Sequence, residues 1–304
     1  MNESIMDRTA GTGDDMPRKS VIAEGGFDVS PFSRNGSLQP VFTTSSGALF
    51  KGDCLKILPK IADKSVHTVF ADPPFNIGKE YGESVDDRKD EGDYLKWCYA
   101  WIDECTRVLK DGGSFFLYNI PKWNILLSTH MLGTGLHFRA WIVVDIKFGL
   151  PIPGRLYPSH YSLLYFTKGK PNIFRNIRTP IKQCRHCGRD VKDYGGHRDA
   201  MNPLGVNLTD VWSDIPPVRH AKFKSKKWKV NALSTKLLDR VVEMSTKKGN
   251  IVLDPFGGSG TTFAVCEKKG RRWIGIEIDS TDIIRDRFES DDLICHKNDD
   301  FVDV

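Results

Sequence analysis

The fold is decided by a short stretch near the carboxyl end of the chain, residues 251–262, which reads IVLDPFGGSGTT. An apolar run leads into an acidic residue, Asp254, and then into a turn with three glycines. Glycines between a strand and a helix permit tight turning and a close approach of a ligand to backbone N–H groups. The pattern predicts a ligand-binding turn at the carboxyl end of a strand in an open α/β sheet.

Glu277 strengthens this prediction. It lies in the next apolar run, 272–278, about twenty residues after the glycine turn, where an acidic side chain can accept hydrogen bonds from ribose hydroxyls. Three other interpretations fail. The turn has no Gly-Lys-Thr/Ser of a phosphate-binding loop, Ser259 lacks the spacing of a hydrolase nucleophile elbow, and a dinucleotide site usually lacks the preceding Asp-Pro-Phe.

A second motif, Asp72-Pro73-Pro74-Phe75, follows the apolar run 66–71. The exocyclic amino group of adenine or cytosine is conjugated with its ring and is a poor nucleophile. A carboxylate and a backbone carbonyl that each accept one N–H would draw the nitrogen towards tetrahedral geometry. Pro73 and Pro74 fix φ and remove donors, so the Pro73 carbonyl can point inward. Phe75 offers a flat face to a base swung out of a duplex.

The composition is that of an ordinary soluble protein, with 39% hydrophobic and 27% charged residues. No apolar run approaches the ~20 residues of a membrane span, and the N-terminus has no apolar signal segment. Seven cysteines, an odd number, argue against a disulfide framework. We therefore expect a protein of the reducing cytoplasm.

The chain divides into four segments. Residues 1–45 lack sustained periodicity and are expected to form a disordered tail. Residues 46–169 and 231–290 alternate strands and helices, which implies a mostly parallel sheet covered on both faces. Residues 170–230 are polar and basic, and are expected to be an inserted target-recognition region. The expected strands are 48–53, 66–71, 114–118, 138–148, 161–167, 250–254 and 272–278. One expected helix ends near residue 61, and three others span 93–109, 234–247 and 260–269.

The segment after the catalytic motif, residues 76–92, is rich in glycine and charge, and we expect a loop that closes over the substrate. Asp93 is the expected N-cap of the helix that follows. Its aromatic residues Tyr94, Trp97 and Trp101 are expected to pack in the core rather than to bind a base.

Residues 219–229 are basic, with Phe223 and Trp228 interleaved. This mixture favours contact with nucleic-acid phosphate over a solvated loop. The residues expected to bind DNA are Arg219, Lys222, Lys224, Lys226, Lys227 and Lys229.

Together the two motifs resemble those of the amino-group (N6-adenine/N4-cytosine) DNA methyltransferases, which use S-adenosylmethionine. Because the catalytic motif comes first, the chain looks like the permuted β class, over about residues 48–285. The resemblance implies a Rossmann-like fold whose seven-stranded, mostly parallel sheet has one reversed strand and helices on both faces. It also implies an enzyme that methylates a base flipped out of double-stranded DNA, in a restriction-modification or epigenetic role.

The resemblance also assigns residues. Asp72, Pro73, Pro74 and Phe75 are implied to be catalytic. Glu277 would hold the ribose and Asp53 would approach the adenine of the cofactor. The implied cofactor-binding residues are Asp53, Asp254, Phe256, Gly257, Gly258, Ser259, Gly260, Thr261, Thr262 and Glu277. One departure is that residues 231–236 read NALSTK where the family often has a His-Pro-x-Gln-Lys-Pro-like string, so Ser234 and Thr235 are the available donors to the methionine carboxylate.

Several alternatives stay open. Within the family that the chain resembles, a first-position Asp leans towards adenine N6 and a Ser towards cytosine N4, so N4 of cytosine stays open. Methylation of RNA or of a protein amide, and an inactive DNA-binding relative, are less favoured. Cys184-x-x-Cys187 resembles a zinc knuckle with His186 and His197 nearby, but a second Cys pair is absent and no metal is assigned. The sequence does not decide the recognition site, the existence of a cognate restriction endonuclease, or the choice between monomer and homodimer.

Overall fold

Two neighbouring parallel strands carry the two motifs. They are β3 (Val66–Ala71) and β10 (Ile251–Asp254), in which Val252 lies opposite Thr68 and Leu253 opposite Val69. Both are almost wholly buried, as expected of parallel strands covered on both faces. The structure is a computed structural model that describes residues 26–78, 87–145, 153–154, 156–181, 183–184, 186–189, 195–197, 200, 202–216 and 232–289.

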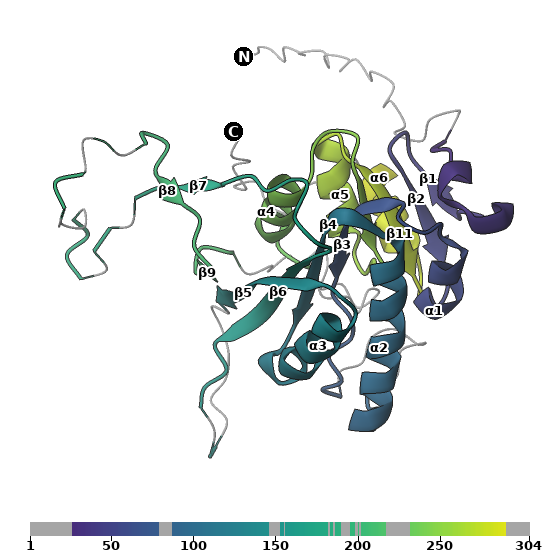
Figure 1. Ribbon diagram of the computed structural model, residues 1–304, viewed down its shortest axis with the longest axis horizontal. Coiled ribbons are helices and arrows are strands. Elements are labelled where there is room, and N and C mark those ends of the chain that lie inside the picture. The colour runs from purple at the N-terminus through teal and green to yellow at the C-terminus, as the bar shows by residue number, and fades with distance from the viewer. Residues whose placement is uncertain are drawn as a thin grey trace, which may run out of the picture.

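The main sheet has nine strands in the order β1-β2-β11-β10-β3-β4-β6-β5-β9 (Figure 1). From β2 to β5 the strands are parallel, except that β6 is antiparallel to both of its neighbours. This confirms the predicted seven-stranded sheet with one reversed strand, to which β1 and β9 add two short edges. The bounds are β1 (Phe42–Thr43), β2 (Gly47–Lys51), β4 (Leu109–Asn119), β5 (His137–Asp145), β6 (His160–Thr167), β9 (Val211–Trp212) and β11 (Arg272–Glu277).

Helices cover both faces of this sheet. Residues of a strand alternate between the two cores, so Val69 and Ala71 pack with the first set of helices and Phe70 packs with the second. The first set is α1 (Cys54–Ile57), α2 (Glu91–Val108) and α3 (Pro121–Gly133), with the short helix η3 (Leu58–Lys60). The second set is α4 (Thr235–Ser245), α5 (Thr261–Lys268) and α6 (Asp282–Glu289).

Residues 26–45 correct the expected disordered tail. Phe27 stacks on Phe32 with ring centroids 5.5 Å apart, and Phe42 is buried against α6. This segment forms η1 (Ser30–Phe32), η2 (Arg34–Gly36) and β1. A few aromatic side chains anchor it without any regular period, which is why its sequence did not indicate order. The expected tail over 1–25 lies outside the described residues.

Two helices also differ from expectation. α2 begins earlier because Asp90, not Asp93, is its N-cap, and the Asp90 side chain accepts a hydrogen bond from Gly92 N. α3 was not predicted. Its inner face buries Trp123, but its outer face exposes Ile125 (59%), so no amphipathic period marks it.

The described residues between Arg175 and Asp214, within the region expected to be inserted, include a projecting ribbon and are called the arm here. Figure 1 shows β7 (Arg178–Thr179) and β8 (Val206–Asn207) as a two-stranded ribbon that projects away from the body. β9 pairs with β5, so the region expected to be an insertion, 170–230, also contributes to the main sheet. Within the described ranges no helix has the length and apolar character needed to cross a membrane, and the six cysteines there are free.

Candidate active site

The glycine turn after β10 is braced by two acidic side chains. Asp254, 2% exposed, accepts hydrogen bonds from Phe256 N at 3.0 Å and from Thr262 Oγ1 at 2.6 Å. Glu277, at the end of the adjacent β11, accepts one from Gly258 N at 2.6 Å. Burial raises the pKa of Asp254 to about 7, and the charge of Glu277 adds to the shift. Asp254 therefore stabilises the turn from the buried side, through its two hydrogen bonds.

The turn leaves room for a ligand at one position. Gly258 and Gly260 adopt φ of +51° and +75°, which favour glycine. A Cβ on Gly260 would lie 3.1 Å from Ile284, so that position is packed. A Cβ on Gly258 would meet nothing nearer than the Phe256 carbonyl oxygen at 3.9 Å. The backbone at Gly258 is therefore open to close approach.

The other predicted cofactor residues lie around this turn. Asp53 is the N-cap of α1, where its Oδ1 accepts from Leu55 N at 3.0 Å. Gly52 N donates to the Glu277 carbonyl oxygen at 2.8 Å, which brings Asp53 beside the carboxyl end of β11. The buried residues of the turn and of the start of α5 are Gly257, Ser259, Gly260, Thr261 and Thr262.

Ser234 has an unused hydroxyl. It is the N-cap of α4 and is 5% exposed, but its Oγ has no hydrogen-bond partner in the part of the chain that the structure describes. Thr235, the first residue of α4, is fully buried beside it. Buried polar atoms usually have partners, so this hydroxyl is suited to a ligand atom.

The catalytic motif faces a cluster of aromatic rings. The Phe75 ring lies 5.5 Å from that of Tyr161 and 6.2 Å from that of Tyr118, and the two tyrosine rings are 5.3 Å apart. Burial raises the pKa of both tyrosines, and the carboxylate of Asp72 raises it further. The negative charge of Asp72 therefore lies close to both phenols.

Tyr118 and Tyr161 are site residues that sequence reasoning missed. Tyr118 lies near the carboxyl end of β4, and Tyr161 lies near the start of β6. Because β6 is reversed, its start meets the carboxyl ends of β3 and β4 at one edge of the sheet. No local motif marks these two tyrosines, and only the order and direction of the strands would have predicted them.

Helix α2 connects the catalytic motif with the glycine turn. The Tyr94 hydroxyl donates to the Pro74 carbonyl oxygen at 2.7 Å. On the same helix, Trp97 and Trp101 pack on Phe256, with ring centroids 5.7 and 5.1 Å away. The expectation that these aromatics pack in the core is confirmed, and Tyr94 has a polar contact in addition. The two motifs thus share one edge of the sheet and one supporting helix.

The predicted loop 76–92 is closed at its base. Asp87, 3% exposed, accepts hydrogen bonds from Asn76 N at 2.6 Å and from Ile77 N at 3.0 Å. The Asn76 side chain exchanges bonds of 2.9 and 2.8 Å with the backbone of Lys89. Residues 79–86 lie outside the described ranges, so closure over a substrate stays a prediction.

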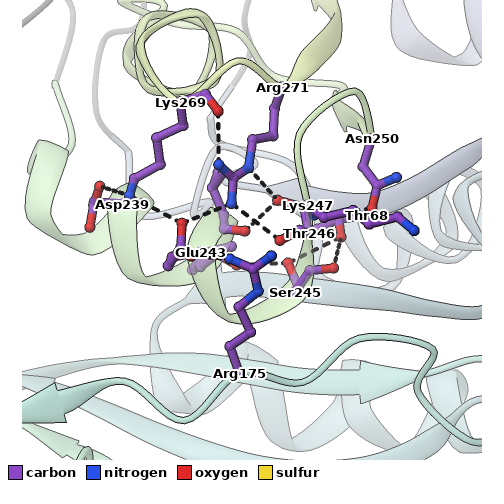
Figure 2. A network of polar contacts seen from close by, with 12 residues as sticks. Thr68, Arg175, Asp239, Glu243, Ser245, Thr246, Lys247, Asn250, Lys269 and Arg271 are labelled. Atoms are coloured by element: carbon purple, nitrogen blue, oxygen red, sulfur yellow. Dashed lines mark hydrogen bonds and ion pairs between the residues drawn. The ribbon is translucent and has the colours of Figure 1, made fainter. Parts of the chain in front are cut away.

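The arm is fixed to α4 where it leaves the body. Arg175 N donates to the Met244 carbonyl oxygen at 3.0 Å, and its guanidinium bonds Glu243 at 2.5 Å. Figure 2 shows Glu243 at the centre of a network that also takes in Lys269 and Arg271. Buried charges need such pairing to offset their desolvation.

The arm is fixed to α4 again where it returns. Asp214 forms hydrogen bonds of 2.8 and 2.5 Å with Arg240, whose guanidinium lies 5.3 Å over the Trp212 ring. Burial would raise the pKa of Asp214, but the hydrogen bonds and charges of Arg240 and Lys236 hold it well below its ordinary value. The base of the arm is therefore attached to α4, the helix whose N-cap is Ser234.

Two further predictions are not tested by these contacts. Cys184 and Cys187 lie on a turn closed by a 2.8 Å bond from Gly188 N to the Cys184 carbonyl oxygen, and no group of three or more potential metal ligands occurs among the residues described. The predicted DNA-binding residues lie outside the described ranges: Arg219, Lys222, Lys224, Lys226, Lys227 and Lys229.

Comparison with known proteins identifies the family. A model of the DNA methylase family matches residues 66–283, which include both motifs. The chain belongs to the DNA methylase family. It is 56% identical over 265 residues to the type II methyltransferase M.BamHI of Bacillus amyloliquefaciens, covering 87% of this chain and 62% of the relative. It is 30% identical over 257 residues to the DNA adenine methyltransferase YhdJ of Escherichia coli (strain K12), covering 81% and 83%.

Solved structures share the fold of this DNA methylase. PvuII DNA methyltransferase (cytosine-N4-specific) matches with a TM-score of 0.60 and 19% identity, covering 83% of this chain and 89% of that one. M1.HpyAVI in complex with SAM matches with a TM-score of 0.54 and 16% identity, covering 80% and 98%. The chain spans 62% of the length of M.BamHI, so activity and substrate are inferred from the site.

Proposed function

We propose that this DNA methylase transfers a methyl group from S-adenosylmethionine to the exocyclic amino group of a base flipped out of double-stranded DNA. One observation carries the proposal: the acidic motif and the glycine turn end adjacent parallel strands and contact the same helix. The names of M.BamHI and YhdJ, both methyltransferases, support it.

The residues around the glycine turn fit S-adenosylmethionine. The cofactor, when bound, supplies a methyl group on a positively charged sulfur. Open space above Gly258 admits a ligand, and the Glu277 carboxylate lies beside it to accept from ribose hydroxyls. The Ser234 Oγ, which has no partner in the described part of the chain, and Thr235 would donate to the methionine carboxylate from the start of α4.

The residues around Asp72 fit a planar base. The Asp72 carboxylate and the Pro73 carbonyl would each accept one N–H of the amino group and free its lone pair. The rings of Phe75 and Tyr161 would stack against the flipped base. Preorganised groups of this kind contribute roughly a hundred- to a thousandfold in rate, by analogy with oxyanion-hole donors.

The proposed target atom is N6 of adenine, because the catalytic motif begins with Asp rather than Ser. N4 of cytosine is the alternative, since it presents the same amino chemistry. The arm on α4 would read the DNA sequence, and the basic stretch 219–229 would contact phosphates.

A methyl-transfer assay tests the proposal. The purified protein is incubated with S-adenosylmethionine that carries a labelled methyl group. Separate reactions contain duplex DNA, RNA or a glutamine-containing peptide as the substrate. We expect label in duplex DNA, and N6-methyladenine after digestion and mass spectrometry. Label only in RNA or peptide would overturn the proposed substrate, and N4-methylcytosine would overturn the choice of adenine alone.

A further inference from the structure

Two buried donors hold the backbone of the catalytic loop from outside it. The Tyr94 hydroxyl on α2 donates to the Pro74 carbonyl oxygen at 2.7 Å, and Trp123 Nε1 on α3 donates to the Phe75 carbonyl oxygen at 2.6 Å. Both donor side chains are only 1% exposed. The two carbonyls that directly follow Asp72-Pro73 are therefore fixed by two different helices.

The donors are themselves held in place. The Tyr94 and Trp123 rings pack together with centroids 4.7 Å apart. Asn119 Nδ2, at the fully buried end of β4, donates to the Tyr94 hydroxyl at 3.1 Å, and its Oδ1 accepts from Ile120 N at 2.7 Å. Because the Tyr94 oxygen accepts from Asn119, its single hydrogen is directed to Pro74.

We propose that Tyr94 and Trp123 are positioning residues for methyl transfer. By fixing the carbonyls of Pro74 and Phe75, they orient the Pro73 carbonyl and the Asp72 carboxylate towards the target amino group. Peptide planes are rigid and both prolines have fixed φ, so pinning two successive carbonyls leaves the third little freedom. The inference rests on the proposed function and goes beyond it, because neither side chain belongs to a predicted motif.

Removing one hydrogen bond tests the inference. Tyr94→Phe keeps the ring and its packing but removes the hydroxyl. We expect the single-turnover rate of methyl transfer to duplex DNA to fall at least about tenfold, since small misplacements of reacting groups cost up to about a hundredfold. The dissociation constants for S-adenosylmethionine and for the duplex should stay within about twofold of those of the unaltered protein, because no group that faces a ligand is changed.

A matched control lies on the same helix. Tyr99 stacks on His130 with centroids 4.1 Å apart, so Tyr99→Phe makes the same chemical change away from the catalytic loop and should leave the rate unchanged. Trp123→Phe should lower the rate in the same way as Tyr94→Phe. In the double variant the fall in rate should be smaller than the product of the two single falls, because both bonds act through one loop.

The outcomes separate this inference from the proposed function. If the unaltered protein methylates DNA and Tyr94→Phe does so at the same rate, the positioning role is wrong and the proposed function stands. A fall in rate matched by an equal fall in cofactor affinity would also overturn the positioning role, since such a result indicates general damage to the fold. If the unaltered protein labels no DNA, the proposed function and the inference fall together. Thermal unfolding of each variant confirms that the rates compare folded proteins.

Discussion

The cofactor turn and the catalytic loop lie at the ends of neighbouring strands, but they are stabilised in different ways. The cofactor turn is hydrogen-bonded by two acids close to it: Asp254 accepts from Phe256 N and Thr262 Oγ1, and Glu277, on the adjacent β11, accepts from Gly258 N. The catalytic loop takes its support from outside, through Tyr94 and Trp123 on the helices and through the Asp87 carboxylate. The hydrogen bonds of the cofactor turn come from the turn and the adjacent strand, whereas two of those that hold the catalytic loop come from helices that follow it in the chain.

This difference has a consequence for function. Changes inside the cofactor turn should weaken cofactor binding directly, because its hydrogen bonds shape the backbone that a ligand would approach. Loss of the Tyr94 or Trp123 hydrogen bond should lower the rate of methyl transfer and leave cofactor affinity intact, because these two bonds reach only the backbone of the catalytic loop.

Replacement of Asp72 by Ala should abolish methyl transfer almost completely. The variant loses the acceptor that draws the amino nitrogen out of conjugation, so we expect a fall in rate of about a thousandfold. Cofactor affinity, measured by calorimetry, should change by less than about threefold, which is within about 1 kcal/mol. Asp103→Ala, which removes an exposed carboxylate on α2 that pairs with His130 of α3, is the control. Retained turnover in the Asp72 variant would defeat the catalytic assignment.

Replacement of Gly258 by Val should weaken cofactor binding. A β-branched residue is strained at φ of +51°, and its side chain would occupy the open space above the turn. The strain should lower stability, whereas the steric block should lower affinity for S-adenosylmethionine roughly ten- to a hundredfold, since a forced clash costs about 1–3 kcal/mol.

Gly249 provides the matched control for this variant. It has φ of +78°, and a Cβ added there would meet nothing within 4 Å, but it lies in the turn before β10, at the other end of that strand. Gly249→Val should therefore lower the stability of the protein without changing cofactor affinity. Equal losses of affinity in the two valine variants would contradict a cofactor site at Gly258.

The same difference explains what the sequence could predict. The glycine turn and its acids lie close together in the sequence, so the motif predicted β10, α5 and β11 and put Glu277 near the turn, although its bond to Gly258 N was not predicted. Asp72 and Phe75 were also found locally, but Tyr118 and Tyr161 reach the site only because the reversed β6 lies beside β4. α3 was missed because its exposed face is apolar as well, so it shows no helical period.

Replacement of Asp87 by Asn should loosen the base of the catalytic loop. The carboxylate accepts hydrogen bonds from Asn76 N and Ile77 N, and an amide offers one acceptor in place of two. We expect amide hydrogen exchange at positions 76 and 77 to accelerate at least about tenfold, since bonds to a charged acceptor are worth about 1.5–3 kcal/mol.

The Asp87→Asn variant also tests whether support of the catalytic loop affects the rate of methyl transfer alone. Methyl transfer should slow while cofactor affinity is unchanged, as with the other supports of the loop. Asp90→Asn, which keeps an N-cap acceptor for Gly92 N, is the control because it makes the same chemical change nearby. Unchanged exchange at 76 and 77 would show that the Asp87 carboxylate does not hold the loop.

The pH dependence of stability tests the cofactor turn without any ligand. The pKa of Asp254 is about 7 in the folded protein against 3.8 for an ordinary carboxyl, mainly because of burial. An acid whose folded pKa is raised binds more protons when folded, so its stabilising contribution is complete below about pH 4 and is lost as the pH rises to about 7. In that window this group should lower the free energy of unfolding by up to about 1.4 kcal/mol per pH unit.

Asp254→Asn should flatten this slope, because an amide does not titrate. Urea unfolding of the unaltered protein and the variant, from pH 4 to pH 8, measures the difference. Asp93→Asn, which changes a carboxylate that is 67% exposed on α2, is the control. If the unaltered protein and Asp254→Asn lose stability in parallel, Asp254 is ionised throughout the range. The turn would then be held by a charged carboxylate, and its support would resemble that given to the catalytic loop by Asp87.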